Sequence, residues 1–199
     1  MFYRIIVTIL KFLVFIAFDL EIHNKDRIDN TNGALIACGN HISMIDPVIL
    51  AVSSKRQIHF MGKKELFDNK ILGFLFKKLG AFPVDRGGVS MSAIKSSLSV
   101  LKSNEVLGIF PEGTRVKNYD ENNAKPGIGL IANKAKSNII PFYIKGSYKF
   151  RGKIEIFFGE EKNYFENIEG KINSETYSKI GKKILQDIYG LSGRYNYEN

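Results

Sequence analysis

The 199-residue chain has only one cysteine, Cys38, so it cannot form an internal disulfide. This scarcity fits a protein of a reducing compartment. Cys38 lies in an apolar run, and we interpret it as a core residue rather than a reactive thiol. No cluster of Cys, His and carboxylate residues has the spacing of metal ligands, so we expect no metal site.

Motifs of several common function classes are also missing. The sequence has no Walker-type phosphate loop, no RNP-like aromatic block and no basic-region helix. It also lacks a Gly-x-Ser-x-Gly nucleophile elbow, which disfavours a lipase or thioesterase with a serine nucleophile. We therefore expect no nucleic-acid partner and no serine hydrolase chemistry.

Acidic residues are outnumbered: 20 Asp and Glu stand against 29 Lys and Arg, which gives a net charge of +9. This balance favours an anionic partner such as nucleic acid, an anionic membrane surface, or an acidic carrier or substrate. Because nucleic-acid motifs are missing, we expect an anionic membrane surface. The length predicts one domain with a substantial core, and neither an internal repeat nor a low-complexity linker divides it.

Charged residues are sparse in residues 1–20, which are mostly aromatic and aliphatic. Arg4, Thr8 and Lys11 fall on one stripe of a helix. A bilayer-spanning helix would place Lys11 near the centre of the membrane, where a charge is costly. We therefore predict an interfacial membrane helix over residues 1–20, with Arg4 and Lys11 toward the headgroups. A secretory signal is disfavoured, since no small-residue cleavage site follows at residues 19–25.

A second apolar stretch, residues 71–76, lies within a helical period at residues 66–79 and is followed by Lys77 and Lys78. We interpret it as a helix that faces the core. The alternative is a second membrane-touching patch whose lysines face the headgroups.

Apolar runs alternate with helical periods along the rest of the chain. The runs predict strands at residues 34–39, 57–61, 81–84, 106–110, 139–144 and 153–158. The other helical periods predict helices at residues 47–54, 89–103, 128–137 and 175–189. Continuous apolar strands separated by helices are typical of a sheet covered on both faces. The expected fold is therefore α/β, with a mixed, mostly buried sheet covered by helices.

A histidine and a carboxylate stand five positions apart where the first apolar run ends, at His41 and Asp46. A carboxylate can hold one ring N–H of a histidine and stabilise the imidazolium that forms when the other nitrogen takes a proton. This spacing does not align two side chains on a regular helix, so they could meet only across a turn. In the alternative interpretation, Asp46 is a helix N-cap before Pro47, and His41 is a structural histidine.

Two turns rich in Gly and Pro each carry an arginine after an apolar run: Arg86 within residues 82–88 and Arg115 within residues 110–115. The guanidinium fork suits phosphate oxygens, and glycines let the backbone approach a ligand. The alternative for each arginine is a surface ion pair.

Together these segments resemble the glycerolipid acyltransferase family, and within it most closely the bacterial 1-acylglycerol-3-phosphate acyltransferases. The first family block is matched by Asn40, His41 and Asp46, and the third is matched without a gap by residues 110–115. Residues 82–88 are similar to the second block and residues 139–144 to a looser fourth. Segments 62–67 and 125–127 are also similar, so the resemblance runs in order from residue 35 to residue 144.

The resemblance implies transfer of a fatty acyl group from an acyl thioester to the free hydroxyl of 1-acyl-sn-glycerol 3-phosphate, giving phosphatidic acid. His41 would be the general base and Asp46 would orient it. Direct transfer is preferred to an acyl-enzyme, because Ser43 is too close in sequence to His41 to be an obvious nucleophile.

The resemblance also implies the groups that bind the acceptor. Arg86 and Arg115 would hold its phosphate, and Glu112, Gly113 and Thr114 would shape its site. Lys125, or one of Lys63 and Lys64, would add a positive charge; the alternative for each lysine is a solvated side chain.

No cofactor is expected, since the thioester is already activated; the donor would be acyl-ACP or acyl-CoA. The expected partners are a lysophospholipid, the anionic membrane surface and, as a further candidate, acyl carrier protein. The expected location is the cytoplasmic face of the cell membrane. Competing interpretations are an acyltransferase that uses glycerol 3-phosphate or another lysolipid, and a non-catalytic membrane module that binds anionic lipids.

The expected domain organisation follows from these assignments. Residues 1–20 would form the interfacial membrane helix, residues 21–192 the acyltransferase catalytic domain and residues 193–199 a flexible tail. Residues 145–199 carry little resemblance to the family, and we assign them no function beyond completing the fold.

Overall fold

The computed structural model describes residues 2–84, 91–166 and 168–193. Arg86 and the expected tail beyond residue 193 lie outside the described residues. The helices are α1 (Phe2–Ala17), α2 (Asp26–Asp29), α3 (Asp46–Val52), α4 (Lys70–Lys78), α5 (Met91–Lys102), α6 (Gly127–Ala135) and α7 (Ser174–Gly190), with short 3-10 helices η1 (Lys64–Phe67) and η2 (Glu121–Asn123). The strands are β1 (Phe18–His23), β2 (Leu35–Gly39), β3 (Ile58–Lys63), β4 (Phe82–Val84), β5 (Val106–Ile109), β6 (Asn138–Gly146) and β7 (Gly152–Phe158).

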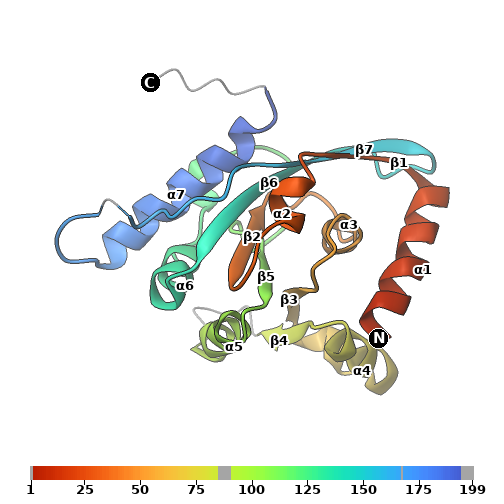
Figure 1. Cartoon of the computed structure of the whole chain (residues 1–199), viewed down its shortest axis with the longest axis horizontal. Coiled ribbons are helices and arrows are strands. Elements are labelled where there is room, and N and C mark those ends of the chain that lie inside the picture. Colours follow the sequence, from red (N-terminus) through yellow and green to blue (C-terminus); the bar gives the residue numbers. More distant parts are fainter. Residues whose placement is uncertain (1, 85–90, 167, 194–199) are drawn as a thin grey trace.

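The strands of the described residues form one seven-stranded sheet in the order β1-β7-β6-β2-β5-β3-β4 (Figure 1). Every neighbouring pair is parallel except β6 and β7, which are antiparallel. The predicted mixed α/β sheet is therefore confirmed, and all six predicted strands are present. The predicted helices after residue 80 correspond to α5, α6 and α7, and the predicted helix at 47–54 corresponds to α3.

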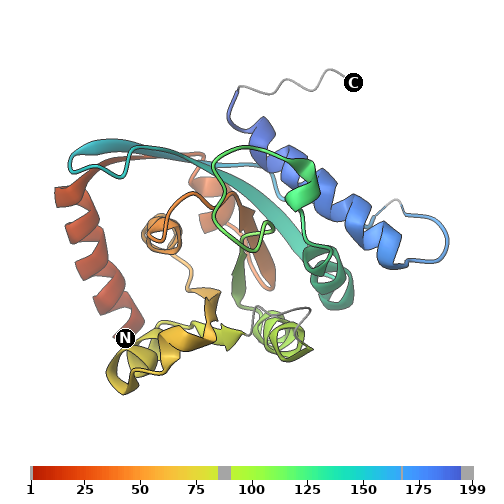
Figure 2. The same cartoon turned by 180° about the vertical axis from the view of Figure 1, so that it is seen from behind.

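Strand β2 shows why the central strands are continuous apolar runs. Leu35 and Ala37 face a core cluster shared with α1 and α3, whereas Ile36 and Cys38 face a second cluster shared with α5, α6 and α7. Figures 1 and 2 show these two groups of helices on opposite sides of the sheet. Burial raises the pKa of the Cys38 thiol well above its ordinary value, and the charge of Glu112 adds to this effect, which agrees with a core role.

The first helix ends earlier than predicted. α1 stops at Ala17, and Phe18 begins β1, which runs parallel to β7 with Phe18 opposite Gly152. The prediction of a helix through Leu20 is wrong, because Phe18 is buried in the core and the following residues pair with β7. Polar and apolar residues alternate along β1, as expected for a strand at the edge of a sheet.

Helix α1 has one packed face and one exposed apolar face. Val14 is buried, and Val7, Leu10 and Ala17 pack against the core cluster on the α3 side of the sheet. The exposed large apolar residues of the helix are Phe2, Ile5, Ile9, Phe12, Leu13, Phe15 and Ile16. None of the helices in the described parts of the chain is long and apolar enough to cross a membrane.

The helix predicted at residues 66–79 is divided in two by Asn69. Its side-chain oxygen accepts hydrogen bonds from the backbone N–H groups of Ile71 and Leu72, 3.0 Å each, and so starts α4 after η1. The expectation that this stretch faces the core is wrong: Ile71 is 81% exposed and Phe74 61% exposed, while Gly73 is buried. α4 therefore presents a second apolar surface.

Candidate active site

The loop that follows β2 is anchored by Asn40. Its buried amide donates to the carbonyl oxygen of Ile144, 2.8 Å away, and accepts from the Ile144 N–H at 2.7 Å. The side chain thereby extends the pairing between β2 and β6 by one position. This contact fixes the place where the chain leaves the sheet and turns toward α3.

His41 and Asp46 meet across this turn, as their spacing predicts. The Nδ1 atom of His41 lies 2.8 Å from Oδ2 of Asp46, which is fully buried. The same oxygen accepts the backbone N–H groups of Ile42 and Ser43, both at 2.7 Å. Asp46 is the first residue of α3 rather than its N-cap, and its carboxylate binds the chain that precedes the helix.

The imidazole of His41 is held on one side by a ring and at one nitrogen by a carboxylate. Its plane lies on the ring of Phe110, with 4.2 Å between centroids and 20° between planes. A carboxylate at Nδ1 favours the tautomer with its proton on Nδ1, so Nε2 carries the free lone pair. Nε2 has no hydrogen-bond partner among the described residues, and the side chain is 12% exposed.

Glu112 supports the backbone of His41. One carboxylate oxygen accepts the His41 N–H at 3.0 Å, and the other accepts the Tyr189 hydroxyl at 2.8 Å. Burial raises the pKa of Glu112, and the hydrogen bonds from Tyr189 and His41 oppose this rise. Each oxygen thus accepts a hydrogen bond from a protein group, and Glu112 links the backbone of His41 to α7.

The loop after β5 carries three further predicted site residues, Gly113, Thr114 and Arg115, and contacts the His41 loop. Gly113 has a φ of +70°, a conformation that favours glycine, and the N–H of Val116 donates to the His41 carbonyl at 2.9 Å. Thr114 and Arg115 are exposed, and the Arg115 side chain has no ion pair or hydrogen bond among the described residues. The described residues therefore provide no ion-pair partner for Arg115.

Two lysines were expected to add charge to this site. The N–H of Lys125 donates to the carbonyl of Pro111 at 2.9 Å, and its side-chain stem lies 3.6 Å from where a Cβ on Gly113 would be. Lys125 therefore belongs to the Gly113 loop. Lys64 is exposed and directly follows β3, while its neighbour Lys63 pairs with Glu65 at 3.1 Å. Because β2, β5 and β3 are parallel, Lys64 lies at the same edge of the sheet as His41 and Arg115.

Two tyrosines contact the site from the part of the chain to which the sequence assigned no function. The Tyr148 hydroxyl donates to Oδ1 of Asp46, and Tyr189 of α7 holds Glu112. No motif or periodicity marks either residue. Only the return of β6 and α7 to the centre of the fold places them beside residues 41–46.

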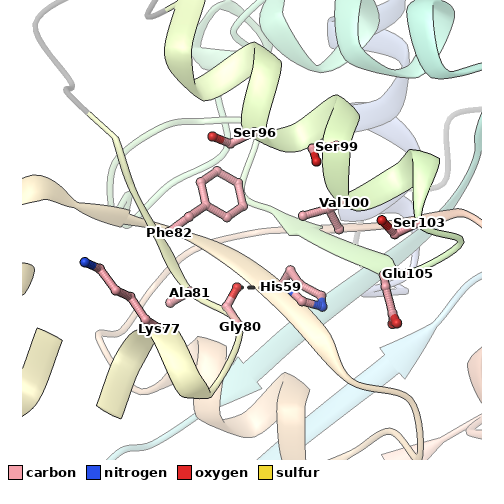
Figure 3. A pocket seen from close by; sticks show the side chains of 10 residues that line it. All are labelled: His59, Lys77, Gly80, Ala81, Phe82, Ser96, Ser99, Val100, Ser103 and Glu105. Carbon is pink, nitrogen blue, oxygen red and sulfur yellow. Dashed lines mark hydrogen bonds between the residues drawn. The ribbon is translucent and has the colours of Figure 1, made fainter. Parts of the chain in front are cut away.

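An open cavity of about 340 Å³ lies elsewhere (Figure 3). It is lined by His59, Lys77, Gly80, Ala81, Phe82, Ser96, Ser99, Val100, Ser103 and Glu105. His59 is near the start of β3, and Glu105 immediately precedes β5. The cavity is therefore at the amino ends of strands whose carboxyl ends carry the His41 site, and it holds none of the expected site residues.

Among the described residues, one group of side chains has the geometry to hold a metal ion, and it is remote in sequence from the His41 loop. Glu21 and His23 on β1 meet Glu155 on β7. Lys153 pairs with Glu21 at 3.0 Å and Lys145 with Glu155 at 3.4 Å. The group is therefore a surface network in which lysines balance the carboxylates.

Comparison with known proteins shows the family of the chain. The acyltransferase family matches residues 19–145. A 1-acyl-sn-glycerol-3-phosphate acyltransferase of Bacillus subtilis is 35% identical over 79% of this chain and 81% of its own length. One of Streptococcus pneumoniae is 39% identical over 85% of this chain and 64% of its own length.

The fold has a counterpart among solved structures. The crystal structure of the 1-acyl-sn-glycerophosphate (LPA) acyltransferase PlsC of Thermotoga maritima superposes with a TM-score of 0.69, over 98% of this chain and 83% of that one, at 18% identity. This likeness extends the shared architecture to nearly the whole chain, beyond the segment that the family match covers. The chain therefore belongs to the acyltransferase family.

Proposed function

We propose that the protein transfers a fatty acyl group from an acyl thioester to the free hydroxyl of 1-acyl-sn-glycerol 3-phosphate, giving phosphatidic acid. The names of the relatives support this acceptor. The observation that carries the proposal is the His41–Asp46 pair, whose carboxylate is buried and hydrogen-bonded at both oxygens, while Nε2 of His41 has no partner in the described parts of the chain. A non-catalytic lipid-binding module would give this arrangement no role.

In the proposed reaction, Nε2 of His41 takes the proton of the acceptor hydroxyl as its oxygen attacks the thioester carbonyl. The Asp46 carboxylate stabilises the imidazolium that forms. The tetrahedral intermediate then expels the thiolate, which takes the proton back from His41, so the enzyme returns to its starting state. Transfer is direct: no acyl-enzyme forms, and the Ser43 hydroxyl serves the local turn by accepting the N–H of Ile45 at 3.2 Å.

Phosphate recognition is assigned to Arg115, with Lys125 and the Gly113 backbone beside it. An exposed guanidinium that has no partner among the described residues is available for bidentate contact with phosphate oxygens. By the family resemblance Arg86, two residues beyond β4 in the sequence, would join it, and Lys64 would add a positive charge. Binding energy from this non-reacting phosphate would orient the hydroxyl toward His41.

The proposed location is the cytoplasmic face of the cell membrane, with α1 lying in the interface. Its exposed apolar face, the exposed side chains of Arg4 and Lys11 and the net charge of +9 support an anionic lipid surface as a partner. The apolar residues of α4 would contribute to the same attachment. A membrane-bound enzyme would meet its monoacylated acceptor in the leaflet.

The direct test is an assay of the purified protein with lysophosphatidate and, in separate reactions, acyl-ACP and acyl-CoA, without added metal or cofactor. We expect phosphatidic acid, identified by mass spectrometry, with at least one donor. Glycerol 3-phosphate and a phosphate-free lysolipid serve as competing acceptors. Product from either one and none from lysophosphatidate would contradict the proposed acceptor.

Membrane attachment is tested by changing exposed residues of α1 and leaving its packed face intact. The double variant Phe12→Glu, Ile16→Glu is expected to bind anionic vesicles at least about tenfold more weakly, since each buried apolar side chain contributes roughly 1.5–3 kcal/mol. Met91→Glu, which alters an exposed apolar residue of α5, is the matched control. Vesicle sedimentation measures the binding of both variants. Equal binding by the double variant and the control would exclude α1 as the anchor.

A further inference from the structure

The hydroxyl of Tyr148 donates a hydrogen bond to Oδ1 of Asp46 from the turn between β6 and β7. The other oxygen of Asp46 is occupied by His41 and by the N–H groups of Ile42 and Ser43. Among the described residues, Tyr148 is therefore the single donor that Oδ1 has. It lies outside every segment that resembles the family blocks.

The ring of Tyr148 is held from several directions. It meets Phe18 edge to face, with 5.8 Å between centroids and 79° between planes. The turn itself is tied to the end of α1, because the N–H of Arg151 donates to the carbonyl of Ala17 at 2.6 Å. The N–H of Ser147 donates to the carbonyl of Lys153 at 2.9 Å. These contacts fix the direction in which the hydroxyl points.

Tyr148 remains a donor over the whole working range of pH. Burial raises the pKa of its hydroxyl, and the charge of Asp46 and the hydrogen bond to it raise that pKa further. A neutral donor at Oδ1 draws part of the carboxylate charge away from Oδ2, the oxygen that faces His41. The stabilisation of a protonated imidazole by Asp46 is thereby reduced.

We propose that Tyr148 is a positioning residue of the acyl-transfer site, which fixes the Asp46 carboxylate and limits the negative charge that Oδ2 presents to His41. This inference rests on the proposed function. Other titratable groups near the pair are Glu112, at the backbone N–H of His41, and Arg115 in the same loop. Neither is altered when Tyr148 is changed.

The variant Tyr148→Phe keeps the ring and its contact with Phe18 and removes the hydroxyl. Hydrogen bonds to charged groups change an equilibrium by about tenfold or more. We expect kcat with lysophosphatidate to fall about tenfold, KM to change less than about twofold, and the acidic limb of kcat/KM to move up by about one pH unit. The limb moves upward because, without the Tyr148 hydroxyl, Oδ2 carries more negative charge and keeps His41 protonated to a higher pH.

Tyr164→Phe is a matched control. The Tyr164 hydroxyl donates to an Asp187 carboxylate oxygen at 2.7 Å, a contact of the same kind away from His41, and its pKa is raised by the same causes. The control is expected to keep the wild-type kcat and pH profile. Equal losses of kcat in both variants with no shift of the acidic limb would reduce Tyr148 to a structural residue and overturn the proposal.

A measurement independent of turnover separates this inference from the proposed function. The protein has three histidines, and the ring resonances of His41 in the ¹⁵N-labelled protein are identified by their loss in His41→Ala. Titration should show a higher His41 pKa in Tyr148→Phe than in the wild type, whichever acceptor the enzyme uses. An unchanged His41 pKa would overturn the proposal even if transfer to lysophosphatidate is observed.

A second variant covers the case in which Tyr148→Phe fails to fold. Replacing Tyr148 by 3-fluorotyrosine keeps the hydroxyl and makes it a stronger donor. The His41 pKa and the acidic limb should then move down, opposite to the effect of phenylalanine. A shift upward, or none, would contradict the proposed role.

Discussion

A folded His41→Ala variant is expected to lose acyl transfer to lysophosphatidate by about 10²–10⁴-fold, the usual contribution of a general base. The fold should persist, because the buried Asp46 carboxylate keeps three of its donors: two backbone N–H groups and Tyr148. Membrane attachment should also persist, since α1 does not include the site. Initial rates, a thermal melt and vesicle sedimentation measure the three properties.

Asp46→Asn is the companion variant. The amide oxygen can take the place of Oδ2 and keep the N–H groups of Ile42 and Ser43, while the amide nitrogen faces Tyr148. The geometry is therefore largely retained, but the negative charge is lost. Turnover should fall because the imidazolium of His41 is less well stabilised. Near-wild-type turnover by a folded His41→Ala protein would rule out the general-base mechanism.

Arg115→Lys is expected to reduce kcat/KM for lysophosphatidate by about 10–100-fold, since an ammonium cannot reproduce the two parallel hydrogen bonds of a guanidinium to phosphate. Arg115 is exposed and has no partner among the described residues, so its replacement should leave the melting temperature unchanged. A phosphate-free lysolipid acceptor provides the internal control, because its rate should scarcely change. Equal losses with both acceptors would show that Arg115 acts on the fold or on the donor and not on the acceptor phosphate.

The strands could be predicted because a sheet covered on both faces selects continuous apolar runs. The same rule explains why β1 was missed. The sequence of β1 alternates, as in a half-exposed edge strand, and is not a continuous apolar run. β1 also directly follows the apolar helix α1, and composition alone does not show where the helix ends and the strand begins. The end of α1 at Ala17 is set by the distant strand β7, which no local pattern reveals.

The candidate site likewise contains residues that the sequence predicts and residues that it does not. His41 and Asp46 were predictable because five residues across a turn suffice to bring them together. The partners of Glu112, the His41 backbone and Tyr189, which is 77 positions away, were not predictable. Tyr148 reaches Asp46 across 102 positions. Such contacts depend on the topology of the sheet, and a lone tyrosine carries no signal of them.

The parallel pairing of β1 with β7 has a consequence for synthesis of the protein. His23 and Glu155, 132 positions apart, are neighbours in the finished sheet. At roughly 5–20 residues per second, the ribosome adds β7 on the order of ten seconds after β1 has been made. Throughout this interval β1 lacks its partner strand, so the exposed apolar face of α1 can meet a lipid surface before the sheet is complete. The nascent chain would then complete its sheet while already attached to the bilayer.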